Sequence, residues 1–360
     1  MKAAVFHAPN QPLTIENVEI ENPGPREVLV RTAVAGLCHS DLHFIEGKYP
    51  FPVPAVLGHE SAGIVEKVGR DVTYLKPGDH VISCLSVFCG HCEYCLTGHM
   101  SICQTPEVKI PPGKAKRLRW KGEHLNQFTN LSSFAEQMLV HEHALVKITP
   151  DMPMDLAALI GCGVITGYGA IVHTAKIEPG STVAVVGCGG IGLAAVNGAK
   201  IAGATRIIAV DKDPGKLELA KTFGATDGVL ATDEAAKEII ELTQGGVHYS
   251  FECIGLKQTA EMCFAMLRPG GTATIIGMIP FGTKIELHGA DFLRERRIQG
   301  SMMGSNRFRI DMPRLIEFYQ QGRLPLQHLV SGRLKLEQIN EGFAAMKAGG
   351  VARNVIMFDA

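Results

Sequence analysis

The chain has 360 residues, of which 46% are hydrophobic and 20% are charged, and this composition is typical of a soluble globular protein with about two domains. Its formal net charge of −1 argues against a nucleic-acid partner, because phosphate binding favours a strongly basic surface. No window contains the ~18 consecutive apolar residues of a membrane helix. The N-terminal segment also lacks the apolar stretch of a signal peptide, so we expect a cytoplasmic protein with no membrane partner.

Residues 1 to about 155 are predicted to form mainly β-strands, because short β-branched runs recur there between Gly and Pro turns. The alternation of apolar and polar residues from Glu27 to Ala35 fits a half-buried strand. A short helix is predicted to begin at Ser40 or Asp41, since both are good N-cap residues. The basic run from Lys114 to Lys121 is predicted to be a solvated loop rather than a phosphate or partner patch.

Four cysteines in this half have the spacing Cys-x2-Cys-x2-Cys-x7-Cys: Cys89, Cys92, Cys95 and Cys103. This spacing lets one loop place four thiolates around one zinc ion, and zinc with four sulfur ligands is coordinatively full and structural. Ten cysteines in a reducing compartment are better explained by metal binding than by disulfides. The cysteines outside the two candidate metal sites are predicted to be small buried apolar residues: Cys84, Cys188, Cys253 and Cys263.

Three further residues, Cys38, His59 and Cys162, have the side chains of a second zinc site that keeps one coordination position open. They are far apart in the sequence, so spacing alone cannot show whether folding brings them together. Taken singly, each is better explained as a buried residue than as a ligand. Other histidines are weaker candidates, since His141 and His143 alternate on a predicted strand.

From about Ser181 the pattern changes to an alternation of strands and helices, which indicates a doubly wound sheet. The apolar run from Ser181 to Gly187 is typical of a strand that is buried on both faces. One helix is predicted near Ile191 to Ala202, and another from Pro214 to Phe223 with Gly224 as its C-terminal stop. Further strands are predicted at 206–211, 227–230, 247–255 and 271–278, with a helix between the last two that ends at 268–271.

The sequence Gly187-x-Gly189-x-x-Gly192 follows the first of these strands and opens the first helix, which is the context of a dinucleotide-binding turn. Glycine lets the backbone approach a pyrophosphate, and the helix N-terminus offers free N–H groups. Asp211 ends the next strand, 19 residues after Gly192, where a carboxylate can accept hydrogen bonds from ribose hydroxyls and would repel a 2′-phosphate. The sequence therefore predicts NAD rather than NADP. The alternative is a glycine turn that only packs a helix on a sheet.

After about Gly300 two amphipathic helices are predicted at 311–322 and 336–350, each closed by glycine, and a final strand at 353–358. This tail is too short for a domain of its own, so we expect it to pack on the N-terminal half. The run from Ile298 to Met303 fits an edge strand and fits a buried core strand equally well.

Several motifs occur together in this chain: Gly58-His59-Glu60-x2-Gly63-x5-Gly69, the four-cysteine loop, Gly161-Cys162-Gly163, the turn at 187–192 and Asp211. With them the chain resembles, over essentially its whole length, the zinc-dependent medium-chain alcohol dehydrogenases. The resemblance implies an α/β protein with a GroES-like β-rich catalytic domain and a doubly wound Rossmann domain. The implied ranges are 1–163 and 303–360 for the catalytic domain, with the structural zinc loop at 89–103, and 164–302 for the Rossmann domain.

The resemblance also implies roles for single residues. Cys38, His59 and Cys162 would bind a catalytic zinc. Glu60 would be an inner neighbour of that zinc, and Asp41 would be the acceptor that orients the His59 ring. Contacts with NAD are implied for nine residues: His39, Gly187, Gly189, Gly190, Ile191, Gly192, Asp211, Lys216 and Arg353.

The implied reaction is the NAD-dependent interconversion of an alcohol and its aldehyde or ketone, with zinc as a Lewis acid. Ser40 and His43 match a proton relay, and an ordinary imidazole pKa of ~6.5 suits proton release near neutrality. A rough alignment suggests that Tyr49, Leu85 and Phe128 line the substrate pocket, and core packing is the alternative for each. Relatives form homodimers or homotetramers, so the resemblance implies a homo-oligomer.

The metal-ligand and relay residues also discriminate between alternative functions. Cys162 disfavours the polyol dehydrogenases, and the zinc-free quinone reductases lack these cysteines. Glutathione-dependent formaldehyde dehydrogenases share the core motifs, so the sequence does not exclude that activity. The segment 104–130 resembles bacterial enzymes acting on benzyl, allylic or medium-chain primary alcohols. The non-enzyme alternative is a zinc- and nucleotide-binding redox sensor, and the pair Ser40 and His43 argues against it because a sensor needs no proton relay.

Overall fold

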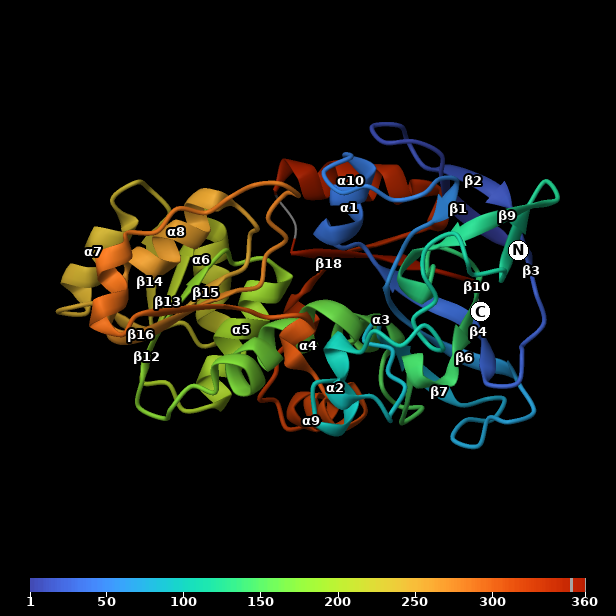
Figure 1. Ribbon diagram of the computed structural model, residues 1–360, viewed down its shortest axis with the longest axis horizontal. Helices are drawn as coiled ribbons and strands as arrows, with labels where there is room; N and C mark the ends of the chain where they lie inside the picture. The colour runs from blue at the N-terminus through green and yellow to red at the C-terminus, as the bar shows by residue number, and fades with distance from the viewer. Residues whose placement is uncertain (350–351, 360) are drawn as a thin grey trace. The chain divides into compact units, whose positions relative to one another are not determined.

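The computed structural model describes residues 1–349 and 352–359, and the chain divides into two compact units (Figure 1). The first unit comprises Met1–Cys162, Arg307–Tyr319 and Leu326–Ala360, and the second comprises Gly163–Asn306 and Gln320–Pro325. The expected ranges had their breaks after residues 163 and 302. They did not include the short segment Gln320–Pro325, which belongs to the second unit.

The first unit contains two sheets that are mainly antiparallel. One has the strand order β2-β1-β5-β9-β8-β3, and the other has the order β11-β7-β6-β4-β19-β18, with β10 also paired to β4. The strands are β1 (Lys2–Phe6), β2 (Thr14–Asn17), β3 (Glu19–Ile20), β4 (Glu27–Gly36), β5 (Ala55–Val56), β6 (Glu60–Val68), β7 (His80–Ser83), β8 (Leu118–Trp120), β9 (Glu123–Gln127), β10 (Gln137–His141), β11 (Leu145–Ile148), β18 (Val330–Leu334) and β19 (Arg353–Met357). In the second sheet β4 is central, because β6 pairs with one of its edges and β10 and β19 pair with the other.

The helices of this unit are α1 (His39–Ile45), α2 (Glu93–Leu96), α3 (Met154–Leu159), α9 (Phe308–Gln320) and α10 (Ile339–Ala348). The first begins at His39 with Cys38 as its N-cap, so the predicted start at Ser40 or Asp41 is wrong by one or two residues. The Asp41 carboxylate does not cap this helix, because it accepts the N–H of Gly58 instead.

The C-terminal tail packs on the N-terminal half, as expected. In Figure 1 the red C-terminal elements α10 and β18 lie among the blue N-terminal elements of the same unit. Strand β19 pairs with β4, and Phe343 of α10 contacts Phe134 edge to face with ring centroids 5.9 Å apart. Helix α10 ends at Ala348 before Gly349 in the left-handed conformation, and Gly350, which also belonged to the predicted helix, lies outside the described residues.

The basic run is only partly a solvated loop, so this prediction is wrong for its second half. Arg117 is 5% exposed, and it donates to Glu27 Oε1 and to Gln127 Oε1 at 2.7 Å each. The next residues form β8, in which Leu118 is buried and Trp120 pairs with Glu123 of β9. The alternation of basic and apolar residues therefore has the period of a strand.

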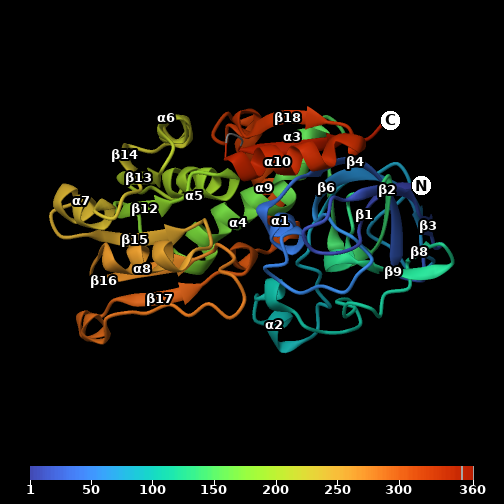
Figure 2. The same cartoon turned by 90° about the horizontal axis from the view of Figure 1, so that it is seen from above.

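The second unit contains one parallel sheet with the order β14-β13-β12-β15-β16-β17, which Figure 2 shows from above. The strands are β12 (Thr182–Val186), β13 (Arg206–Asp211), β14 (Asp227–Leu230), β15 (Val247–Glu252), β16 (Leu267–Ile275) and β17 (Arg297–Gly300). The first strand in sequence lies at the centre and the order reverses there, as in a dinucleotide-binding sheet. This arrangement confirms the predicted doubly wound fold. Strand β17 forms one edge of the sheet.

The helices of the second unit are α4 (Ile165–Gly169), α5 (Gly190–Ile201), α6 (Pro214–Phe223), α7 (Ala235–Leu242) and α8 (Lys257–Ala265). Helix α6 has the predicted bounds, because the Asp213 side chain caps it, Pro214 occupies its first turn and Gly224 ends it with a φ of 118°. Helix α8 ends at Ala265, not at 268–271 as predicted, since β16 begins at Leu267 and pairs with Val247.

One helical stretch, Met154–Ala175, is long and apolar enough to meet the criteria for a membrane span. However, 83% of its most apolar window is buried inside the protein, as expected for a core helix. Of the four remaining cysteines, Cys84, Cys188 and Cys263 are fully buried as predicted, whereas Cys253 is only partly buried.

Candidate functional site

Three distant segments of the first unit converge on one buried cluster. The ligand atoms of Cys38, His59 and Cys162 all lie within 4.8 Å of one another, and each residue is at most 4% exposed. Cys38 caps α1, His59 directly precedes β6, and Cys162 lies in the π-helical turn Ile160–Val164 that follows α3. The fold thus brings together the three residues that sequence spacing could not connect.

This donor set fits zinc. Two sulfurs and an imidazole are ligand types that zinc prefers, and three protein ligands are the pattern of zinc sites that keep a position open for another ligand. A hydrogen bond from the Cys162 thiol lowers the pKa of Cys38 well below its usual value, although burial opposes this shift. The Arg353 guanidinium acts in the same direction, so the cluster favours a thiolate at Cys38.

Asp41 fixes the orientation of the His59 ring. Its Oδ1 lies 3.1 Å from His59 Nδ1 and accepts the N–H of Gly58 at 3.1 Å. Because Nδ1 faces the carboxylate, Nε2 is the nitrogen that can bind a metal. Asp41 is completely buried, and burial raises the pKa of its carboxyl group, an effect that the contact with His59 opposes.

A buried ion pair lies on another side of the cluster. Arg353 Nε is 3.5 Å from Glu60 Oε1, and its Nη1 donates to the Leu37 carbonyl at 3.1 Å. Arg353 is 3% exposed and Glu60 is completely buried. The structure therefore places Arg353 in the core beside the metal-ligand cluster, and its contact with a cofactor stays a prediction.

The two residues of the predicted relay lie on α1. Ser40 Oγ is 3.6 Å from Cys38 Sγ, and His43 is three residues further along the helix, which places both on one face. Among the described residues, His43 Nδ1 is buried without a hydrogen-bond partner. Burial lowers the pKa of His43 from its usual value of 6.5, so the imidazole is neutral at pH 7. His39, by contrast, is exposed at the start of the helix.

An aromatic cluster adjoins the metal-ligand cluster. The ring centroid of Phe128 lies 5.9 Å from that of His59. Phe44 and Phe51 contact Phe128 edge to face, with centroid distances of 4.8 and 5.2 Å. Tyr49 lies 5.8 Å from Phe44. Phe128 is 3% exposed and belongs to a buried core cluster against which Phe44 and Phe51 pack, so part of this aromatic cluster is core packing, and contact with a substrate stays a prediction.

Two of the three suggested pocket residues, Tyr49 and Phe128, therefore belong to this aromatic cluster. Leu85 is partly buried and packs on a different core cluster, around the cysteine loop, so the alternative of core packing describes it better. Sequence reasoning missed Phe44 and Phe51. The available signal was the density of aromatic residues at the end of α1 and directly after it, in a chain with only 6% aromatic residues.

The four cysteines of the 89–103 loop also converge, with all sulfur atoms within 4.8 Å of one another. The N–H groups of His91 and Cys92 donate to Cys89 Sγ at 3.5 and 3.3 Å, and the Thr105 hydroxyl does so at 3.3 Å. Although burial opposes it, these hydrogen bonds lower the pKa of Cys89 to about 5. Four sulfur ligands in one loop fit a closed structural zinc site.

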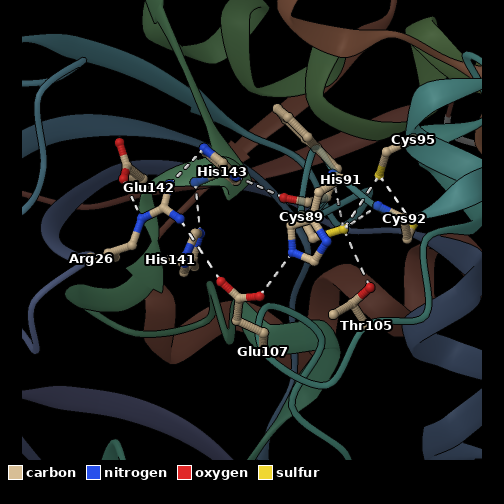
Figure 3. A network of polar contacts seen from close by, with 11 residues as sticks. Arg26, Cys89, His91, Cys92, Cys95, Thr105, Glu107, His141, Glu142 and His143 are labelled. Carbon is tan, nitrogen blue, oxygen red and sulfur yellow. Dashed lines mark hydrogen bonds and ion pairs between the residues drawn. The ribbon is translucent and has the colours of Figure 1, made fainter.

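A polar network that the sequence did not indicate ties this loop to the second sheet (Figure 3). Arg26 Nε contacts Glu142 Oε1 at 2.9 Å, and its Nη2 contacts His143 Nε2 at 3.0 Å. Since a guanidinium only donates, His143 Nε2 must accept, and Nδ1 carries the proton that it donates to the Phe88 carbonyl at 2.8 Å. His143 thus holds the residue next to Cys89. It lies in the turn Glu142–Ala144, so its predicted place on a strand is wrong.

The network also includes His91 of the cysteine loop and Glu107, which follows the loop. His91 Nε2 lies 3.1 Å from Glu107, which in turn lies 3.9 Å from Arg26. His141 Nδ1 accepts the backbone N–H of His143 at 3.0 Å. The contacts of His91 with Glu107 and of Glu107 with Arg26 join residues that are far apart in sequence. Only the folded structure therefore shows that this network supports the cysteine loop.

In the second unit the glycine turn is a tight connection between β12 and α5 that is open on one side. Gly187 directly follows β12 with a φ of 95°, and α5 begins at Gly190. A Cβ on Gly192 would lie 1.7 Å from the Gly187 carbonyl oxygen, so only glycine permits the turn to close against the helix. A Cβ on Gly189 would meet no described residue within 4 Å, so this part of the turn is open next to the helix N-terminus. This arrangement fits a pyrophosphate.

Asp211 is held firmly at the end of β13. Its Oδ2 accepts the N–H of Cys188 at 2.7 Å, and its Oδ1 accepts the N–H of Asp213 at 3.0 Å. It is 7% exposed. Each oxygen keeps a further lone pair for a ligand hydroxyl, which fits a ribose. Lys216 lies nearby on α6 and is partly buried.

Comparison with known proteins gives consistent matches along the chain. Residues 24–151 match the family described as "Alcohol dehydrogenase GroES-like domain", and residues 190–321 match "Zinc-binding dehydrogenase". The chain is 38% identical over 371 residues to an "Alcohol dehydrogenase class-3" of Myxine glutinosa, which covers 99% of this chain and 97% of that protein. These matches confirm the two expected domain types.

Two solved structures are also similar. An alcohol dehydrogenase zinc-binding domain protein from Burkholderia ambifaria has a TM-score of 0.94 and 37% identity, with 100% of this chain and 99% of that chain covered. A benzyl alcohol dehydrogenase from Acinetobacter calcoaceticus has a TM-score of 0.92 and 34% identity, with 99% of each chain covered.

Replacing Asp41 with Asn should weaken metal binding at the Cys38 cluster by about 10- to 100-fold, because the charge that orients and polarises His59 is lost. Competition with a chromogenic zinc chelator measures the affinity. Asp311→Asn is the matched control, since Asp311 is 1% exposed and accepts the N–H of Arg307. Equal zinc retention in both variants would show that Asp41 does not support the ligand.

Acid should destabilise the protein through His141, which is 6% exposed and whose pKa is lowered to about 4, mainly by burial. The unfolded side chain binds a proton near pH ~6.5, so stability is fully present above that pH and is lost as the pH falls towards ~4. His141→Asn keeps an acceptor for the His143 N–H and removes this titration. Urea unfolding at pH 7.5, 6 and 5 should therefore show a smaller acid loss in the variant, and parallel curves would contradict the assignment.

Proposed function

The chain belongs to the zinc-dependent medium-chain alcohol dehydrogenases, and from this membership we propose that it interconverts a primary alcohol and its aldehyde with NAD and NADH. The observation that carries the proposal is the buried convergence of Cys38, His59 and Cys162. A three-ligand set from separate segments suits a zinc that binds substrate, whereas the four-cysteine loop suits a zinc that only stabilises structure.

We propose two zinc ions per chain, one held by Cys38, His59 and Cys162 and one by the 89–103 loop. NAD would bind at the 187–192 turn with its adenosine ribose on Asp211. When bound, zinc would supply a Lewis acid for the substrate oxygen and NAD would supply the hydride acceptor. The open side of the turn and the fixed carboxylate of Asp211 support the choice of cofactor.

The residues of α1 handle the proton in this proposal. The Ser40 hydroxyl accepts the proton of the substrate hydroxyl and passes its own proton towards His43 on the same helix face. Because burial lowers the pKa of His43, its imidazole is neutral at pH 7 and can take up the proton. Asp41 keeps the His59 ring in place during the reaction, since its carboxylate bonds both the ring and the preceding backbone N–H.

The aromatic cluster of Phe44, Tyr49, Phe51 and Phe128 supports an aromatic, allylic or medium-chain primary alcohol as substrate. The similarity to a benzyl alcohol dehydrogenase points the same way. Flat apolar rings bind such substrates through van der Waals contact and exclude water. A short alcohol such as ethanol would leave much of the aromatic cluster uncovered. An S-hydroxymethylglutathione adduct is the alternative substrate, and it belongs in any substrate panel.

We also propose a cytoplasmic homodimer or homotetramer. Strand β17 leaves one edge of the parallel sheet unpaired within the described chain, and an unpaired edge can add a strand of a second copy. Phe292 and Leu293, shortly before this strand, are 47% and 89% exposed. Large apolar side chains at an open sheet edge support contact with another subunit.

The proposed activity predicts NADH formation when the purified protein receives NAD and a primary alcohol. Initial rates with ethanol, hexanol, benzyl alcohol, geraniol and S-hydroxymethylglutathione should give the highest kcat/KM with one of the three larger apolar alcohols. Ser40→Ala should lower kcat by about 100-fold while zinc content is unchanged, because the proton acceptor is lost. Ser101→Ala, at a residue 2% exposed on the cysteine loop, is the control.

Absence of NADH formation with every alcohol would reject the proposed function. Unchanged turnover in Ser40→Ala would instead remove only Ser40 from the reaction. A preference for the glutathione adduct would identify the alternative substrate class.

Cofactor choice should depend on Asp211. Asp211→Gly should lower kcat/KM with NAD by about 10-fold or more, because the ribose loses a charged acceptor, and should improve use of NADP. Asp213→Asn is the matched control, since Asp213 caps α6 by accepting the N–H of Gly215 at 2.8 Å. The measurement is the ratio of the kcat/KM values for NAD and NADP in each variant. An unchanged ratio in Asp211→Gly would disprove the role of Asp211 in cofactor choice.

A further inference from the structure

Glu252 ends β15 and is completely buried, yet no step of the proposed reaction uses it. Its Oε1 accepts the N–H of Ile254 at 2.9 Å and the N–H of Gly255 at 2.8 Å. The hydroxyl of Thr259, on the first turn of α8, lies 2.7 Å from the same oxygen. One carboxylate oxygen therefore bends the loop between β15 and α8 back over the end of its own strand.

The other oxygen of Glu252 faces a second loop. Oε2 is buried and has no hydrogen-bond partner among the described residues. A Cβ on Gly277, just after β16, would lie 2.4 Å from this oxygen and 2.1 Å from the Gly255 nitrogen. The loops after β15 and β16 thus meet backbone to backbone at Gly255 and Gly277, with Glu252 enclosed between them.

Stability alone does not account for this arrangement. A buried carboxylate with one unpaired oxygen costs free energy that an apolar residue of similar size would not cost. The neighbouring thiols of Cys253 and Cys263 do not relieve it, because Oε2 accepts no hydrogen bond from either of them. An unsatisfied buried acceptor in a well-packed sheet therefore needs another explanation.

The loop that Glu252 bends packs against the glycine turn. A Cβ on Gly187 would lie 2.5 Å from Ile254 Cγ1, so the two residues are in close contact, and the N–H of Cys253 donates to Val186 O at 2.9 Å. Ile254 and Leu256 are 39% and 47% exposed. Both lie after the carboxyl end of β15, next to the turn, in the region where open parallel sheets bind their ligands.

We propose that Glu252 is a positioning residue for NAD: by holding the 253–256 loop against Gly187, it presents Ile254 and Leu256 as an apolar wall for the bound dinucleotide. The inference rests on the proposed NAD-dependent function. Its physical basis is pre-organisation, because a loop already held in place loses less conformational entropy when the cofactor binds. The desolvation free energy of the unpaired oxygen is offset, in the bound state, by the smaller entropy loss of a loop that is already ordered.

The test compares full-length variants by fluorescence titration with NADH and by steady-state kinetics. Glu252→Leu removes the side-chain acceptor of both backbone N–H groups and should raise the Kd for NADH and the KM for NAD by about 10-fold. At saturating NAD its kcat and its KM for alcohol should stay within about twofold of the wild type. Glu252→Gln keeps an amide oxygen in the place of Oε1 and should restore near-normal cofactor affinity.

Two further variants keep the proposal testable if Glu252→Leu does not fold. Thr259→Val removes only the hydroxyl contact and should raise the Kd for NADH by a smaller factor, of about threefold. Gly277→Ala inserts a methyl group between the loops and should weaken NADH binding while leaving zinc content unchanged. In both variants, amide hydrogen exchange of residues 253–256 should be faster without cofactor.

Ser250→Ala is the matched control for a merely structural role. Ser250 lies on the same strand, is completely buried and donates to the Cys263 carbonyl at 2.7 Å, away from the loop. It should lower Tm without changing the Kd for NADH. If Glu252→Leu, Thr259→Val and Gly277→Ala all bind NADH as tightly as Ser250→Ala, the inference is overturned. A wild-type protein that binds no NADH would overturn the proposed function instead.

Discussion

The register of the central strand β4 determines where the candidate metal-ligand cluster of Cys38, His59 and Cys162 forms. At its carboxyl end Gly36 lies opposite Glu60 of β6 on one edge and pairs with β19 on the other. Cys38 follows two residues after Gly36 and His59 directly precedes Glu60, so this one register brings a thiol and an imidazole together. Strand β19 carries Arg353 from the chain end to the same place. A Cβ on Gly36 would lie 2.5 Å from Glu60 Oε1, so this close approach depends on glycine.

Both units use a buried carboxylate to hold a short segment of backbone in place. In the first unit Asp41 bonds the N–H of Gly58 together with the His59 ring, and in the second Glu252 bonds the N–H groups of Ile254 and Gly255. Hydrogen bonds to a charged acceptor are stronger than neutral ones, and at a buried site they offset part of the desolvation cost. In each case the segment held lies directly beside a candidate ligand site.

Much of the second unit could be predicted because its signals are local. Helix α6 has the predicted bounds, since Pro214 and Gly224 start and stop it through their own backbone preferences. The errors arose where a non-local contact decides the structure. Arg117 is buried because Glu27 and Gln127 accept from it, although its neighbours in sequence suggested a solvated loop. His143 supports the cysteine loop through Arg26, which is remote in sequence.

The sequence by itself determined the alternation of strands and helices, the glycine turn with Asp211, and the four-cysteine loop, because each depends on residues a short distance apart along the chain. Its resemblance to a known family then implied a ligand role for the residues of the second candidate metal site. Only the tertiary structure decided that Cys38, His59 and Cys162 meet, that Phe44 and Phe51 pack against Phe128, and that Glu252 lies between two loops. The physical reason is that these contacts depend on strand register and on packing between distant segments, which no local pattern of side chains encodes.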